Sequence, residues 1–151
     1  MFKQMRTDES GLTLIELTIV IAILGILAAF IAPQVITAID DAKVGKAQLE
    51  IANMGTALTN YMRDVGTYPS TEEGLDALWR APSDALNWGP EPYLTSPITN
   101  DPWGNEYQYR YPGTHYGVPY DLFSYGKDGK VGGEDLNKDI TNWVEEETEV
   151  N

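Results

Sequence analysis

The 151-residue chain contains no cysteine and a single histidine, and it has few basic side chains. Without cysteine the protein has no disulfide, no thiolate metal site and no cysteine nucleophile. Its 10 Lys and Arg residues are outnumbered by 23 Asp and Glu residues, which gives a net charge of −13. This charge argues against a nucleic-acid partner, because nucleic-acid binding needs a basic surface. The length suits one small domain with an N-terminal appendage.

Sequence patterns that carry catalytic chemistry are missing as well. The chain has no phosphate-binding G-x-x-x-x-G-K-[ST] loop and no G-x-S-x-G element. Its histidine, His115, lies in a glycine-flanked turn and is expected simply to be exposed. The acidic residues gather late in the chain, in a glycine-rich stretch without an evident cleft. We therefore expect that the protein is not an enzyme.

A long apolar segment lies near the start of the chain. Residues 17–39 carry no charge, and about 20 apolar residues are enough to span a bilayer. The run is too long for a conventional cleaved signal peptide and ends in a poor cleavage sequence. One acid, Glu16, stands at its front. Because a charge at the centre of a membrane helix costs roughly 2.5–3.5 kcal/mol, this carboxylate needs a partner.

The residues before Glu16 suggest where that partner comes from. Gly11 precedes Leu12, and Glu16 is the fifth residue counted from Leu12. Cleavage after Gly11 would give Leu12 a free amine within about one helical turn of the carboxylate. An ammonium and a carboxylate largely neutralise each other in a low-dielectric setting. The pair would form within one chain or between neighbouring chains, and Thr13 is a further hydrogen-bond donor to the same carboxylate.

The stretch GLTLIELTIVIAILGILAA resembles the class III signal of type IV pilins and type II secretion pseudopilins. The resemblance implies that residues 1–11 are a leader that a prepilin peptidase removes by cutting between Gly11 and Leu12. The same enzyme would then N-methylate Leu12. Leu12 departs from the family pattern, in which the first mature residue is most often Phe or Met. Residues 12–39 would form the hydrophobic membrane and assembly helix.

Two residues that disfavour a regular helix lie inside this segment, Gly25 and Pro33. One interpretation is a tolerated kink, as in many membrane helices. By analogy with filaments of the family, the other is a stretch that melts when the subunit leaves the bilayer, and we favour this second interpretation. With Thr13 and Glu16, these residues are the ones expected to serve assembly.

The apolar residues after Asp40 recur at steps of three or four, which predicts an amphipathic second half of the same helix over residues 40–66. Its buried stripe is expected to consist of Val44, Ala47, Ile51, Met54, Leu58 and Tyr61. Ser70 and Glu73 then fit a capping box that opens a short helix. We expect the distal domain to pack against this stripe.

Two strands are expected in the distal part of the chain, over residues 106–111 and 120–125, with alternate tyrosines on one face. The segment TYPSTEEGLDALW is similar to a pattern of the major, G-type pseudopilins. The resemblance implies an α+β, type IV pilin-like fold, in which the long N-terminal helix packs against a small antiparallel sheet. Residues 67–151 would form this globular domain, with a short helix, a calcium-binding loop and Trp143 packing the chain end back.

An acidic, glycine-rich stretch, SYGKDGKVGGEDLNKDITNW, forms residues 124–143. Calcium takes six to eight oxygen ligands, but on spacing alone a turn-rich surface loop is an equally good interpretation. The pattern DLFSxGxDGxxGG followed by DIxNW is similar to the calcium loop of G-type pseudopilins. That resemblance implies side-chain ligands at Asp128 and Asp135, a backbone carbonyl from Tyr125, and further donors at Lys130 and Asn137. Glu134 is an alternative to Asp135.

The resemblance also implies a function. Major pseudopilins are single-pass proteins of the bacterial inner membrane with their C-terminal domain in the periplasm. They polymerise into a pseudopilus that helps drive folded proteins through an outer-membrane secretin. The implied partners are copies of the same chain, the prepilin peptidase, minor pseudopilins and the inner-membrane assembly platform. The alternatives are a type IV pilin, which commonly carries a C-terminal disulfide that is impossible here, and a minor pseudopilin; both typically lack the TYPSTEEGLDALW and calcium-loop segments.

Overall fold

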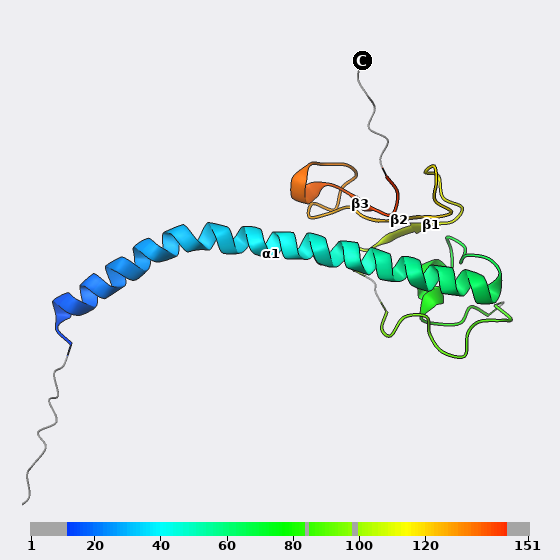
Figure 1. Ribbon diagram of the computed structural model, residues 1–151, viewed down its shortest axis with the longest axis horizontal. Coiled ribbons are helices and arrows are strands. Elements are labelled where there is room, and N and C mark those ends of the chain that lie inside the picture. Colours follow the sequence, from blue (N-terminus) through cyan, green and yellow to red (C-terminus); the bar gives the residue numbers. More distant parts are fainter. Residues whose placement is uncertain (1–11, 84, 98–99, 145–151) are drawn as a thin grey trace, which may run out of the picture. The chain divides into compact units, whose positions relative to one another are not determined.

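The computed structural model describes residues 12–83, 85–97 and 100–144 (Figure 1). Two compact units are distinguished by their internal contacts, Met1–Ile39 and Asp40–Asn151. The elements in chain order are α1 (Leu14–Val65), the 3-10 helix η1 (Gly74–Leu78), β1 (Gln108–Arg110), β2 (Asp121–Ser124), the 3-10 helix η2 (Asp135–Asn137) and β3 (Ile140–Thr141). The expected leader, residues 1–11, lies outside the described residues.

α1 has a defined start and a defined stop. Thr13 precedes it, and the Thr13 hydroxyl accepts a hydrogen bond of 3.2 Å from the backbone N–H of Glu16. At the other end, the N–H of Gly66 donates to the carbonyl of Met62 at 2.8 Å. Gly66 has a φ of 94°, a left-handed conformation that glycine adopts without a steric penalty and that commonly ends helices. The predicted helix end near residue 66 is confirmed.

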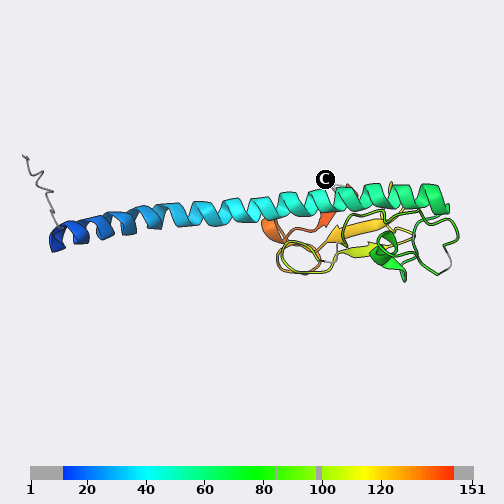
Figure 2. The same ribbon diagram turned by 90° about the horizontal axis from the view of Figure 1, so that it is seen from below.

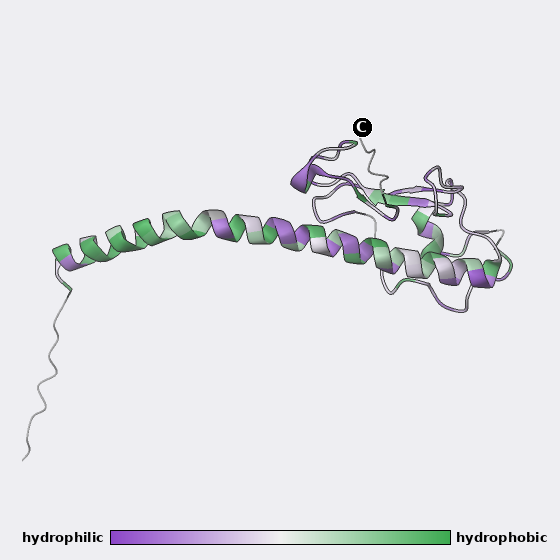
Figure 3. Cartoon of the chain, turned by 45° about the horizontal axis from the view of Figure 1, so that its top comes forward, coloured by the Kyte–Doolittle hydropathy of each residue, from purple (hydrophilic) through white to green (hydrophobic). Residues whose placement is uncertain are grey.

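The first half of α1 is apolar on all sides, as the colouring in Figure 3 shows. Apart from Pro33, whose side chain is not described, every side chain from residue 14 to 39 is exposed. The most apolar window of α1 has a mean hydropathy of 2.8 and no buried residue, so α1 is long and apolar enough to cross a membrane. Gly25 and Pro33 both lie within the helix, and melting of this stretch on assembly stays a prediction.

The second half of α1 lies alongside the sheet (Figure 2) and supplies one side of the hydrophobic core. Of the predicted stripe, five residues are buried to 6% exposure or less, namely Ala47, Ile51, Met54, Leu58 and Tyr61. Val44 is only half-buried. Across from them lie Ala77 and Leu78 of η1 and Leu122 of β2. The prediction that this stripe packs against the distal domain is therefore confirmed.

The sheet is antiparallel, with strand order β1-β2-β3. The two predicted strands exist but are shorter than expected. Tyr111 leaves the ladder because its N–H and carbonyl both bond the Thr71 hydroxyl, each at 3.0 Å. The chain turns after β2, where the N–H of Gly126 donates to Ser124 Oγ at 3.0 Å. β3 was not predicted, because a two-residue strand carries no periodicity to read.

The tyrosines of β1 and its flanks point toward α1, as predicted. Tyr107 is buried and its hydroxyl donates to a Glu50 carboxylate oxygen at 2.7 Å. The Tyr109 hydroxyl donates to the carbonyl of Pro69 at 2.8 Å. Burial, together with the Glu50 carboxylate in the case of Tyr107, raises the pKa of both phenols. Both therefore remain protonated donors, of which Tyr107 ties the sheet to α1 and Tyr109 ties it to the segment that follows α1.

The predicted capping box forms, but the short helix behind it differs from the prediction. The N–H of Ser70 donates to the Glu73 carboxylate at 2.6 Å, and the N–H of Glu73 donates to Ser70 Oγ at 3.2 Å. No α-helix follows directly, because Gly74 takes a φ of 59° and breaks the right-handed run. The chain continues instead as the 3-10 helix η1.

His115 is exposed, as predicted, and it also has structural partners that the sequence did not indicate. Its ring stacks on Trp143 with centroids 3.7 Å apart, and Nδ1 lies 3.0 Å from an Asp121 carboxylate oxygen. Trp143 is thereby held against the domain, as expected. The Asp121 side chain is only 2% exposed and also accepts hydrogen bonds from the N–H and the hydroxyl of Thr114. Burial alone would raise the pKa of Asp121, but the bonds from Thr114 and His115 outweigh it and lower the pKa to about 2.

This network predicts a defined acid sensitivity. The pKa of Asp121 falls from its ordinary value of 3.8 to about 2 on folding, so the ionised carboxylate stabilises the fold above pH 4 or so. That contribution is lost as the pH decreases from about 4 to about 2. We expect Asp121→Asn, which has one acceptor oxygen in place of two, to lower the free energy of unfolding at pH 7 by about 2 kcal/mol. Urea denaturation of the full chain in detergent measures this.

The matched control is Asp41→Asn, which removes an exposed carboxylate. We expect this control to change the free energy of unfolding little. Equal stability of Asp121→Asn and the unsubstituted chain at pH 7 would contradict the assignment.

Candidate functional site

The first candidate site is the start of α1. Gly11 lies outside the described residues, whereas Leu12 and Thr13 are exposed and precede the helix. Glu16 lies in the first turn. The Thr13 hydroxyl accepts a bond from the N–H of Glu16; the expected bond from this hydroxyl to the Glu16 carboxylate stays a prediction. Thr13 and Glu16 have the T-x-x-E spacing of a capping box, a sequence signal that was missed.

The helix end offsets only part of the cost of the Glu16 charge. An acid in the first turn gains typically 0.3–1 kcal/mol from the helix dipole. Burying an unpaired carboxylate among apolar side chains costs several kcal/mol. The difference indicates that the carboxylate of Glu16, once surrounded by apolar material, still needs a cation. Cleavage after Gly11, which stays a prediction, would give Leu12 a free amine four residues before Glu16.

The second candidate site is the glycine-rich loop, which is closed at its base. The N–H of Lys127 donates to the carbonyl of Leu136 at 3.0 Å. A Cβ added to Gly126 would lie 3.0 Å from the same carbonyl oxygen, so the two chain segments are in close contact. Asp128 follows the first of these segments and Asp135 precedes the second. The fold thus places both predicted carboxylate ligands on the two arms of one closed loop.

Left-handed backbone conformations curl this loop. Gly129, Gly132 and Gly133 have φ values of 66°, 84° and 95°, and Asp135 has a φ of 52°. A Cβ on Gly133 would lie only 2.4 Å from the carbonyl oxygen of Asn137. This position therefore accepts only glycine, because any side chain would collide with backbone. Gly133 thus lets the arm before η2 approach the backbone of Asn137 closely.

A buried polar network holds the base of the loop on the domain. The Asn105 amide donates to the carbonyl of Gly126 at 3.0 Å. The Ser124 hydroxyl accepts from the N–H of Gly126 and donates to an Asp101 oxygen at 2.6 Å. Asp101 is 5% exposed and Ser124 is fully buried. The sequence did not predict this contact, since residues 105 and 126 are 21 positions apart along the chain.

The donor set of the loop suits a hard cation. Asp128 and Asp135 are exposed, and Asn137, the last residue of η2, adds an amide. One Asp128 oxygen accepts the N–H of Lys130 at 3.1 Å. Among the described residues no three His, Cys, Asp or Glu side chains cluster to hold a metal. A cation here would thus bind two carboxylates, with amide and backbone carbonyl oxygens completing its shell, which is an all-oxygen set of the kind that Ca²⁺ accepts.

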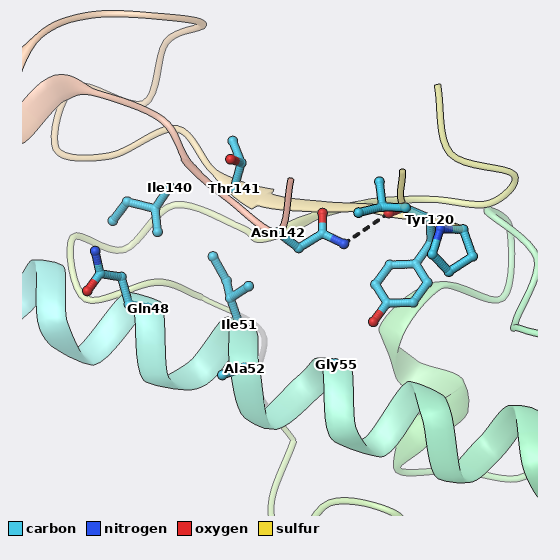
Figure 4. Close-up of a pocket in the computed structure, with 10 residues that line it drawn as sticks. Gln48, Ile51, Ala52, Gly55, Tyr120, Ile140, Thr141 and Asn142 are labelled. Atoms are coloured by element: carbon cyan, nitrogen blue, oxygen red, sulfur yellow. Dashed lines mark hydrogen bonds between the residues drawn. The ribbon is translucent and has the colours of Figure 1, made fainter. Parts of the chain in front are cut away.

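A groove of about 400 Å³ runs between α1 and the sheet (Figure 4). Gln48, Ile51 and Ala52 line it from α1, and Ile140 lines it from β3. No Asp, Glu, Lys, Arg or His is among its lining residues, so the groove has no acid–base pair for catalysis. Nearby, a Cβ on Gly55 would lie 3.2 Å from the hydroxyl of Tyr120, which shows how closely the sheet approaches the helix.

Comparisons with protein families agree with this arrangement. The family described as "Type II secretion system (T2SS), protein G" matches residues 34–143. The "Prokaryotic N-terminal methylation motif" matches residues 6–32. The resemblance stated for the leader and for the TYPSTEEGLDALW segment is thereby confirmed. Cleavage after Gly11 and methylation of Leu12 stay predictions.

Individual relatives match over nearly the whole chain. The type II secretion system core protein G of Pseudomonas aeruginosa is 48% identical over 141 residues, which cover 91% of this chain and 97% of the relative. That of Vibrio cholerae is 39% identical over 143 residues, which cover 93% and 95%. Among solved structures, the major pseudopilin from the type 2 secretion system of enterohaemorrhagic Escherichia coli has 32% identity and a TM-score of 0.59, over 72% of this chain and 92% of that one.

The fold and the matches lead to the same family. The long helix packed on a small antiparallel sheet is the architecture shared with the solved pseudopilin, and the predicted α+β, pilin-like fold is confirmed. The apolar first half of α1 and the methylation motif together indicate a membrane-anchored chain. The chain belongs to the type II secretion system protein G family, the family of the major pseudopilins.

Proposed function

We propose that the chain is the major subunit of a type II secretion pseudopilus. The observation that carries this proposal is the first half of α1, which is helical, apolar on all sides and exposed. Such a surface is stable in a bilayer or against the same helix of other copies. A subunit whose helix moves from the bilayer into a bundle of the same helices is a filament subunit that is held in the membrane before assembly.

The subunit would wait in the bacterial inner membrane with residues 40–151 in the periplasm. Cleavage by a prepilin peptidase frees the amine of Leu12, and the subunit then joins a helical homopolymer. Each contact in such a polymer joins two different surfaces and does not close into a ring, so the product is a fibre. Growth of the fibre pushes folded proteins toward an outer-membrane secretin. Minor pseudopilins and the inner-membrane assembly platform are the further partners.

The role is structural and not enzymatic. The relatives are secretion core proteins and a pseudopilin, which supports a structural role. A type IV pilin or a minor pseudopilin is not favoured, because the protein G description covers residues 34–143, which include both distinguishing segments of the domain.

Calcium would bind in the glycine-rich loop. Asp128 and Asp135 would supply carboxylates, with Glu134 as the alternative to Asp135. Tyr125 and Lys130 would supply backbone carbonyls, and Asn137 a further oxygen. When bound, the ion cancels the repulsion between the loop carboxylates. The closed base and the left-handed glycines support this proposal, since they hold the two arms together before any ion arrives.

Glu16→Gln tests the charge pair at the start of α1. Glutamine keeps the capping-box geometry but removes the charge, so we expect the subunit to be processed and yet to form no filaments. Electron microscopy of sheared filaments measures assembly, and intact mass measures processing. The control is Thr18→Val, which removes a polar group in the same stretch and should assemble. Normal filaments from Glu16→Gln would refute the pairing.

Gly11→Val tests the leader. A bulky residue before the scissile bond should block the peptidase, so intact-mass analysis of the membrane-extracted chain should find residues 1–11 retained and Leu12 unmethylated. Ser10→Ala, one residue earlier, is the control and should be processed normally. A processed Gly11→Val chain would contradict the assignment of the cleavage site.

Asp128→Ala tests the metal. The full chain in detergent should melt at a higher temperature in calcium than in chelator, by an amount that corresponds to about 2.7 kcal/mol at a hundred times the dissociation constant. The variant should lose this difference, because it lacks a charged ligand. The control, Glu72→Gln, removes an exposed acid outside the loop and should keep the difference. Identical melting of the unsubstituted chain with and without chelator removes the metal from the proposal.

A further inference from the structure

An ion pair links the base of the glycine-rich loop to α1. Lys127 Nζ lies 2.8 Å from an Asp40 carboxylate oxygen, although the two residues are 87 positions apart. The Asp40 side chain is 11% exposed and that of Lys127 46%. The short contact is a charge-assisted hydrogen bond. Because Asp40 is largely shielded from solvent, salt screens the pair less than it screens a surface pair.

The position of Lys127 creates a problem for a cation-binding loop. Lys127 immediately precedes Asp128, and its N–H bonds the carbonyl of Leu136, next to Asp135. An ammonium on a flexible stem has three donors and reaches several neighbouring oxygens. If it turned into the loop, it would pair with the carboxylates there and repel a divalent ion. The chain thus carries a competing cation beside its own proposed calcium ligands.

We propose that Asp40 is a positioning residue that holds the Lys127 ammonium against α1 and so leaves the loop carboxylates available for calcium. This inference rests on the proposed calcium site. Asp40 itself belongs to α1 and is not a ligand. Its contribution acts through Lys127, because an occupied ammonium does not compete for Asp128 or Asp135.

The proposal predicts an unusual pattern among variants. Asp40→Asn frees the ammonium, which should weaken calcium binding. Lys127→Met removes the competitor, so calcium should bind at least as tightly as to the unsubstituted chain. The double variant carries neither charge and should recover the affinity that Asp40→Asn loses. If the ion pair only stabilised the fold, the pattern would differ. Removing either Asp40 or Lys127 would then weaken calcium binding equally.

Isothermal titration of the full chain in detergent with calcium chloride measures these affinities. We expect Asp40→Asn to bind about fivefold more weakly or worse, and the double variant to match the unsubstituted chain. The matched control is Asp41→Asn, which removes a neighbouring exposed carboxylate of the same charge and should leave the affinity unchanged. Melting curves in chelator establish that each variant is folded.

Three results would overturn the role of Asp40: unchanged affinity in Asp40→Asn, equal weakening in Lys127→Met, or equal weakening in the Asp41→Asn control. Each of these requires that the unsubstituted chain binds calcium, so the calcium loop itself would stand. If the unsubstituted chain shows no calcium binding, the loop assignment fails and the role of Asp40 fails with it.

Discussion

The first half of α1 has no apolar surface to pack against among the described residues of its own chain, and this constraint explains most other features of the protein. Its side chains are exposed from residue 14 to 39 except at Pro33, which is not described. Exposure of so much apolar surface to water is unfavourable at roughly 25 cal/mol per Å². A bilayer or contact with other apolar helices would remove the penalty, which agrees with a membrane-anchored chain of the pseudopilin family.

The same apolar surroundings make the charge of Glu16 unfavourable unless it has a partner. The helix dipole and the Thr13 cap stabilise this end of α1, but their contribution is smaller than the cost of a charge in apolar surroundings. At the bilayer edge the carboxylate is tolerable without a partner. Inside a bundle of helices it would need a cation, because an unpaired buried charge is strongly destabilising. In the proposed filament, the acid would therefore favour subunits that bring a cation to Glu16.

The distal domain is stabilised without disulfides by the second half of α1 and by polar groups that are buried with partners. Tyr107 and Tyr109 connect the sheet to the helix side, while Asp101 and Asp121 satisfy backbone N–H groups in the turns. Burying these carboxylates is tolerable because their oxygens accept several hydrogen bonds. The glycine-rich loop is built on this rigid base, which is why its two arms meet.

Local patterns in the sequence were enough to predict α1, its buried stripe, the capping box at Ser70 and Glu73, and the family. These features depend on residues within a few positions of one another, and hydrophobic periodicity reads such features well. The pairing of His115 with Asp121 and Trp143, the short strand β3, and the contacts of Asn105 and Asp40 with the loop were not predictable. They join residues far apart along the chain, and no local pattern encodes which distant side chains meet. Only the folded domain brings Lys127 to Asp40, because the two residues are 87 positions apart along the chain.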